Sequence, residues 1–346
     1  MSSVPGLLII FSPKFLGRYS PKNVVICLIV IAAISLIVVS QVNQWFLITL
    51  AMLMITSAQI VIYAIACAIS CEQARDQVNA QNRLARLRSF GPLAVLSASS
   101  IIIIVRPDSA SSMFPGLSYP ALFFCVACLL LASAFYIYKY SNWHKPTERV
   151  TNVHISKILW SYYLMNFLSG SRSILFRAFV ITLFVREFHF DMSKTAGLVL
   201  ASSIAGFIGY RLLSVLSTRL SPRLILGGIY TVVGFLFIGF ALIKVPELLV
   251  VLFLLDSLLF GVSVVTDSTL KVLVNSSELP GQLSTGVAIF HAAGILLPLT
   301  AGLILALTDS LTVIFFFAAI LAWIAAIISQ VHCAIVARVA NSVTPA

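Results

Sequence analysis

The chain has 346 residues, of which 60% are hydrophobic and 10% are charged, against about 45–50% and about 25% in an average soluble domain. This composition excludes a soluble globular protein, and recurring solid apolar runs also exclude a transmembrane β-barrel, whose strands alternate in polarity. The net charge of +11 would suggest nucleic-acid binding in a soluble protein. Here the basic residues follow the ends of the apolar runs, so the lipid bilayer is the expected partner and nucleic acid is not.

The apolar runs predict an all-α polytopic membrane protein with about ten transmembrane helices. Ahead of them, Met1 to Phe11 is a short apolar segment without the features of a signal peptide, and it is expected to form the last turns of a helix. The third span is the shortest and the weakest of the ten. The spans cover 24–41, 44–70, 90–105, 117–138, 157–185, 194–213, 224–243, 248–270, 284–307 and 311–334.

The basic residues predict the orientation, because Lys and Arg favour the cytoplasmic side. Sixteen lie on the side that includes the C-terminus, four lie on the opposite side, and Arg172 and Arg177 lie within a span. The chain is therefore expected to be a multi-pass protein of the cell (inner) membrane with a cytoplasmic C-terminus. The four on the opposite side are Arg106, Arg186, Lys194 and Lys244.

The segment 72–88 is polar, basic and helical in propensity. We expect it to form a cytoplasmic loop whose arginines, Arg88 included, face anionic lipid headgroups.

A short internal repeat joins the two parts of the chain. Arg18, Ser20, Pro21 and Lys22 are echoed by Arg219, Ser221, Pro222 and Arg223, each pair being 201 residues apart. Each copy connects two apolar spans on the predicted cytoplasmic side, and parallel repeats of two halves build one large class of transporters.

On these residues the chain resembles the major facilitator superfamily, in which a cytoplasmic loop of each half carries a Gly-x-x-x-Asp-Arg-x-Gly-Arg-Arg pattern. Arg18, Lys22, Arg219 and Arg223 match its basic positions, whereas Gly17 and Thr218 replace its acidic residue. Further resemblance to prokaryotic members lies in Asn166 to Arg172, in Leu255 to Phe260 and around His291.

The resemblance implies a bundle of two helical halves in which the ten spans are helices three to twelve. The N-terminal half would be 1–138, the cytoplasmic linker 139–156 and the C-terminal half 157–346. On the 201-residue offset, about 45 residues, one helix and most of a second, would be missing ahead of Met1. A mis-called start, a fragment and a shortened member would all explain this.

Three charged residues inside spans are candidates for substrate binding or coupling, because such groups are costly in a bilayer. Arg172 lies near the middle of its span, about 21–22 Å from either end at 1.5 Å per residue. Arg177 and Asp256 each lie about 13 Å below the opposite face, so they are the preferred ion pair. Three interpretations stay open: a structural pair with Arg172 bound to backbone carbonyls, a site for an anion or protons, and an error in the span boundaries.

Other polar residues have two interpretations each. His291 would relay protons or bond to a neighbouring helix. Gln59 and Tyr63, four residues apart on one helix face, would line a cavity or pack among polar groups. Asp267 precedes Lys271 by four residues and is expected to form a local pair. The six cysteines are interpreted as small hydrophobic residues, so no metal, cofactor or catalytic site is expected.

The sequence therefore favours a secondary transporter that moves a small organic solute by alternating access, with proton coupling as an option. The absence of a Gly-x-x-x-x-Gly-Lys-Ser/Thr motif excludes an ATP-driven pump within this chain. The alternative is a non-transporting membrane scaffold or sensor with the same fold. An enzyme is not expected, and the sequence does not indicate an oligomeric state.

Overall fold

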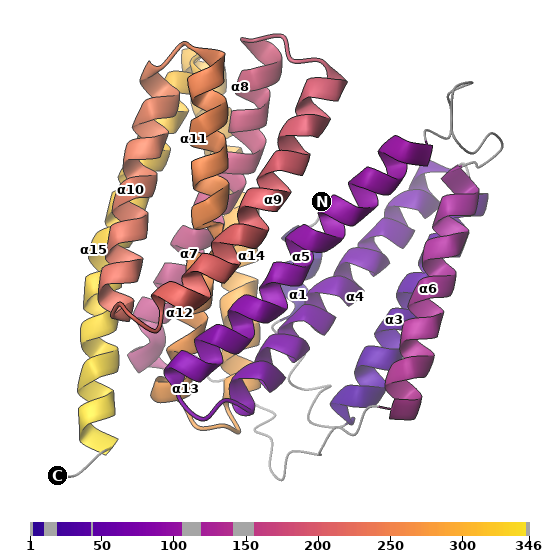
Figure 1. The fold of residues 1–346 in the computed structure, drawn as a ribbon, viewed down its shortest axis with the longest axis horizontal. Helices are drawn as coiled ribbons and strands as arrows, with labels where there is room; N and C mark the ends of the chain where they lie inside the picture. Colours follow the sequence, from indigo (N-terminus) through magenta and orange to yellow (C-terminus); the bar gives the residue numbers. More distant parts are fainter. Residues whose placement is uncertain (1–2, 10–18, 43, 106–118, 141–155, 344–346) are drawn as a thin grey trace.

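In the computed structural model the described residues are 3–9, 19–42, 44–105, 119–140 and 156–343, and every regular element among them is a helix (Figure 1). Within these ranges nine segments are long and apolar enough to cross a membrane. The protein is therefore a multi-pass helical membrane protein, as its composition predicted. The nine segments are Pro21–Gln41, Trp45–Glu72, Pro120–Tyr140, Lys157–Arg186, Lys194–Leu216, Pro222–Leu242, Pro246–Leu273, Leu279–Thr308 and Leu311–Ser342.

The N-terminal group of helices, on the right in Figure 1, consists of α3 (Pro21–Gln41), α4 (Trp45–Glu72), α5 (Gln77–Val105) and α6 (Tyr119–Tyr140). Within it α3 packs against both α4 and α6. The short helix α1 (Ser3–Leu8) packs against α4 and against α14 of the other group.

Helix α5 contains the third predicted span, 90–105, but it begins at Gln77, inside the segment predicted to be a loop. Its 29 residues would extend about 43 Å at 1.5 Å per residue. The predicted helical propensity of 72–88 is thus confirmed. The predicted loop is wrong from Gln77 onward, because the polar residues form the first half of a long helix.

The C-terminal group, on the left in Figure 1, contains the remaining helices, and two of its membrane-spanning segments are irregular. A π-helical turn, η3, lies between α7 and α8, and a 3-10 turn, η4, follows α11. In chain order the elements are η2 (Lys157–Leu159), α7 (Trp160–Leu175), η3 (Phe176–Val180), α8 (Ile181–Arg186), α9 (Met192–Leu216), α10 (Pro222–Leu242), α11 (Pro246–Leu258), η4 (Leu259–Val262), α12 (Ser263–Ser268), α13 (Leu270–Leu273), α14 (Leu279–Thr308) and α15 (Leu311–Val343).

We call the end at which α6 and α15 finish the lower end, following Figure 1, and the opposite end the upper end. The two groups touch where α5 packs against α9, α12 and α13, and where α4 packs against α14. These contacts lie in the lower part of Figure 1, and the groups diverge toward its upper edge.

The internal repeat is a pair of equivalent helix starts. Ser20 and Ser221 are extended N-cap residues, each followed by a proline in the first turn of a helix of 21 residues, a position that tolerates proline because its amide has no helical partner. Both helices begin at the lower end (Figure 1), and α3 packs on α6 as α10 packs on α15. Arg18 and most of the predicted linker, 141–155, lie outside the described residues.

Candidate functional site

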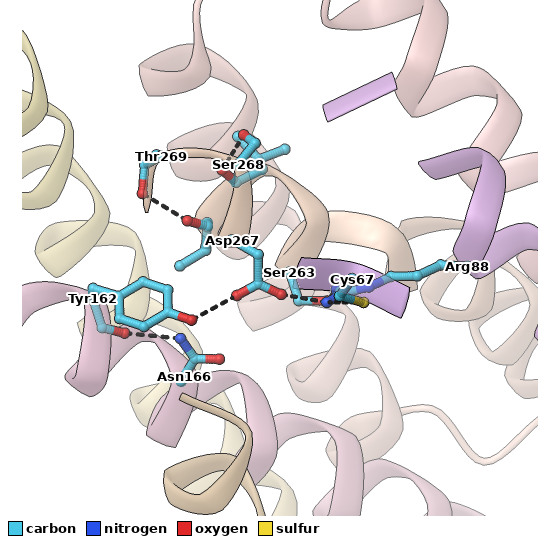
Figure 2. Close-up of polar contacts among 10 residues, drawn as sticks. Cys67, Arg88, Tyr162, Asn166, Ser263, Asp267, Ser268 and Thr269 are labelled. Carbon is cyan, nitrogen blue, oxygen red and sulfur yellow. Dashed lines mark hydrogen bonds and ion pairs between the residues drawn. The ribbon is translucent and has the colours of Figure 1, made fainter. Parts of the chain in front are cut away.

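The lower end holds a buried ion pair between the two groups, formed by Arg88 of α5 and Asp267 of α12 (Figure 2). Only 7% of Arg88 and 4% of Asp267 is exposed. Arg88 Nη1 also donates to Ser263 Oγ at 2.8 Å, and the guanidinium lies 5.4 Å from the centre of the Tyr63 ring. Because each charge is removed from solvent, each depends on its partner across the boundary between the groups.

Tyr162 of α7 completes this cluster from the side opposite Arg88 (Figure 2). Its fully buried hydroxyl donates to Asp267 Oδ1 at 3.1 Å. Gly286 of α14 leaves the space for that hydroxyl, since a Cβ atom at this position would overlap it. The Asp267 carboxylate is thus held by donors from both groups, which fixes its orientation.

Two further polar contacts join the groups at the same end. Asn82 Oδ1 of α5 accepts from the hydroxyls of Ser214 and Ser217 of α9, at 2.8 and 3.1 Å. Lys271 Nζ of α13 donates to the carbonyl oxygen of Glu72, the last residue of α4, at 3.2 Å. A cation at a helix C-terminus also interacts favourably with the helix dipole.

These contacts correct two predictions. Asp267 does not form a local pair with Lys271, because the helix is interrupted at Thr269 and the two side chains reach different elements of the N-terminal group. Arg88 does not face lipid headgroups, because it lies more than two turns inside α5 and is buried.

A second buried ion pair lies wholly within the C-terminal group, between Arg172 of α7 and Asp256 of α11. Arg172 Nη2 lies 2.7 Å from Asp256 Oδ1. The guanidinium also donates to the backbone oxygens of Asp256 and Leu259, at 3.1 and 3.2 Å. Helix α11 ends there and η4 begins, so the arginine satisfies carbonyls at a helix terminus.

The preferred pairing of Arg177 with Asp256 is therefore wrong, and Arg172 is the partner. The depth argument assumed uninterrupted helices, whereas a π-turn separates Arg177 from Arg172 and the end of α11 offers carbonyls to the deeper arginine. The predicted bonding of Arg172 to backbone carbonyls is confirmed. The guanidinium of Arg177 instead lies 4.9 Å from the centre of the Phe260 ring.

The other predicted site residues do not converge on one point. Tyr63 borders Arg88, whereas Gln59 is exposed one turn earlier on α4. His291 lies on α14 directly against α1, since a Cβ atom on Gly6 would overlap its ring. In the part of the chain that is described, no cluster of three potential metal ligands occurs.

The conformational-loop residues make matching contacts in the two groups. Lys22 Nζ donates to the backbone oxygen of Tyr138 near the end of α6, at 2.9 Å. Arg223 Nε donates to Gln330 Oε1 of α15 at 2.7 Å. In each group the basic residue of the repeat therefore ties the first helix to the last, and Arg219, in the turn before α10, is exposed.

A buried histidine network was not predicted from the sequence. His332 of α15 is fully buried, with Nδ1 3.0 Å from Ser161 Oγ of α7 and Nε2 2.9 Å from Thr269 Oγ1. These contacts hold the break between α12 and α13, just after Asp267. The only available signal was a polar residue in an apolar span, and it carried no information about its partners.

No family profile and no curated protein sequence matches the chain. Solved structures of similar fold do exist. A crystal structure of the Escherichia coli fucose:proton symporter FucP has a TM-score of 0.75 at 13% identity, covering 93% of this chain and 87% of that one. The human organic anion transporter MFSD10 has a TM-score of 0.71 at 13% identity, covering 95% and 82%.

A bacterial homologue of the iron transporter ferroportin, in an outward-facing state, has a TM-score of 0.65 at 16% identity and covers 98% of this chain and 88% of that one. At these identities the likeness concerns the fold. Together with the nine apolar segments and the two groups of helices, it shows that the chain has the fold of the major facilitator superfamily transporters.

Proposed function

We propose that the protein is a secondary active transporter that moves a small organic solute by alternating access. The halves 1–138 and 157–346 would rock against each other, joined by the linker 139–156. In this mechanism the lower end opens as the upper end closes, with the solute between the halves.

The observation that carries the proposal is the Arg88–Asp267 pair. It is buried and joins the two groups at the end where they meet. If the halves separate there, the pair must break, and water entering the gap would solvate both charges. A rigid scaffold would gain nothing from a costly ion pair at this position, since apolar packing stabilises as well or better.

We propose that the lower end faces the cytoplasm of the cell in the inner membrane. With Arg88 counted as a buried residue, fifteen basic residues remain on this side against four on the other, which fits the positive-inside rule. A single cysteine at Ser342 of α15 should then resist an impermeant thiol reagent added to intact cells. Labelling from outside would reverse the orientation.

Proton coupling is proposed at Asp256. One of its carboxylate oxygens, Oδ2, is buried without a hydrogen-bond partner among the described residues. A proton on this oxygen would neutralise the carboxylate and weaken its hold on Arg172, which links protonation to the packing of α7 on α11.

The proposal is tested by the separation of the halves at the lower end. In a variant whose six native cysteines are replaced, spin labels at Arg75 and Thr218 report the distance between the α4–α5 and α9–α10 turns. Both positions are exposed, so labelling should not disturb packing. We expect Asp267→Asn to add or enlarge a longer-distance population. One unchanged distance in both proteins would favour the scaffold or sensor.

A further inference from the structure

Arg177 lies on η3, in the middle of a membrane-spanning segment. A π-turn carries an extra residue, which moves one side chain out of the regular helical register, and such turns are frequent at functional sites. The Arg177 side chain is exposed, whereas its neighbours Phe176 and Phe179 are buried in the aromatic core of the C-terminal group. The turn thus places a permanent cation on an accessible surface at membrane depth.

Arg177 has no ion-pair or hydrogen-bond partner within the described ranges. The salt bridges there join Arg88 to Asp267, Arg172 to Asp256 and two pairs near the upper surface. Asp256 lies within electrostatic reach of Arg177, but Arg172 already occupies it. The three central arginines and two central aspartates therefore leave one uncompensated positive charge.

The surroundings place Arg177 toward the boundary between the groups. Tyr210 of α9 interacts electrostatically with Arg177 and also with Arg88, which lies at that boundary. Phe260 supports the guanidinium from the C-terminal group. An arginine facing lipid at this depth would cost several kcal/mol, so its cost is lowest on a face that water and solutes reach.

We propose that Arg177 is the anion-binding residue of the substrate site, and that the site takes a small organic monoanion bearing one carboxylate or sulfonate. The planar guanidinium fork matches such a group in a bidentate manner. One bound negative charge neutralises the central charges, whereas a dianion would leave an excess. This inference rests on the proposed function, since it supplies the solute that the transporter would move.

Binding to purified protein tests the proposal without a transport assay. Thermal unfolding in detergent is followed with increasing benzoate, benzenesulfonate or lactate, each paired with its uncharged amide. We expect the anions, and not the amides, to raise the unfolding temperature. Losing a charged hydrogen bond costs about 1.5–3 kcal/mol, so Arg177→Gln should weaken the apparent affinity at least about tenfold.

Matched variants separate binding from folding. Arg186→Gln removes an exposed arginine from the upper end of the same segment and should behave as the parent protein. Arg177→Gln without ligand should unfold at the same or a higher temperature, because it removes an uncompensated charge, and Arg177→Lys should retain weaker binding. Equal anion effects in the parent and Arg177→Gln proteins, or none with any monoanion, would overturn the proposal.

Two arms identify other outcomes. Stabilisation by phosphatidylglycerol that requires Arg177, without an effect of the soluble anions, would assign the arginine to a lipid headgroup and also overturn the proposal. The spin-label distances are independent of this site. A distance change at the lower end without anion binding would therefore leave the transporter proposal standing while this inference fails.

Discussion

Two buried arginine–aspartate pairs of the same chemistry occupy different mechanical positions. Arg172 and Asp256 join two helices of one group, and the arginine is also bonded to two backbone oxygens. Arg88 and Asp267 join the two groups, and their further partners are side chains. The first pair thus stabilises the fold of one group, whereas the second stabilises one arrangement of the two groups.

The largest expected effect tests the pair within the C-terminal group. Asp256→Asn leaves Arg172 buried without a counter-charge, and losing one partner of such a pair costs about 3–5 kcal/mol. We expect a large fall in the free energy of unfolding, measured by chemical denaturation in mixed micelles. Asp256→Asn combined with Arg172→Gln should recover part of that loss, with a coupling energy from the double-mutant cycle.

Asp267→Asn is the matched comparison, because it should cost less. Arg88 can reach water when the groups separate, whereas Arg172 stays enclosed within one group. Equal losses of unfolding free energy in the two single variants would remove the distinction between the pairs.

An intermediate effect is expected at Tyr162. Tyr162→Phe removes a donor to the buried Asp267 carboxylate, which corresponds to about 1.5–3 kcal/mol. Gly286→Ala should mimic it, since the added methyl group would displace the Tyr162 hydroxyl. Both should lengthen the Arg75–Thr218 distance without the large unfolding expected of Asp256→Asn. If Gly286→Ala left both stability and distance unchanged, Tyr162 would have no part in holding the groups together.

The smallest effect is expected from the repeat. Lys22→Ala and Arg223→Ala each remove an exposed contact between the first and last helices of a group, and such contacts contribute about 1 kcal/mol or less. Thermal unfolding should show small losses of similar size. A large loss from only one variant would indicate that the two contacts are not equivalent.

The helices could be predicted from the sequence better than the contacts between them. Apolar runs and the two Ser-Pro helix starts depend on local chemistry, and the structure places helical segments at all ten predicted spans. The partners of Asp256 and Asp267 depend on local helix irregularity. A π-turn after Arg172 and a break at Thr269 redirect these side chains, and neither has a distinctive sequence signal. Arg88 was misplaced because it precedes the apolar run of its helix.

The most direct test of alternating access measures both ends of the molecule in one pair of proteins. Spin labels at Arg75 and Thr218 report the lower end. Labels at Gln44, just before α4, and Lys244, just before α11, report the upper end, and both residues are exposed. We expect Asp267→Asn to lengthen the lower distance and to shorten the upper one. Upper and lower distances that both stay fixed, or both lengthen, would contradict alternating access.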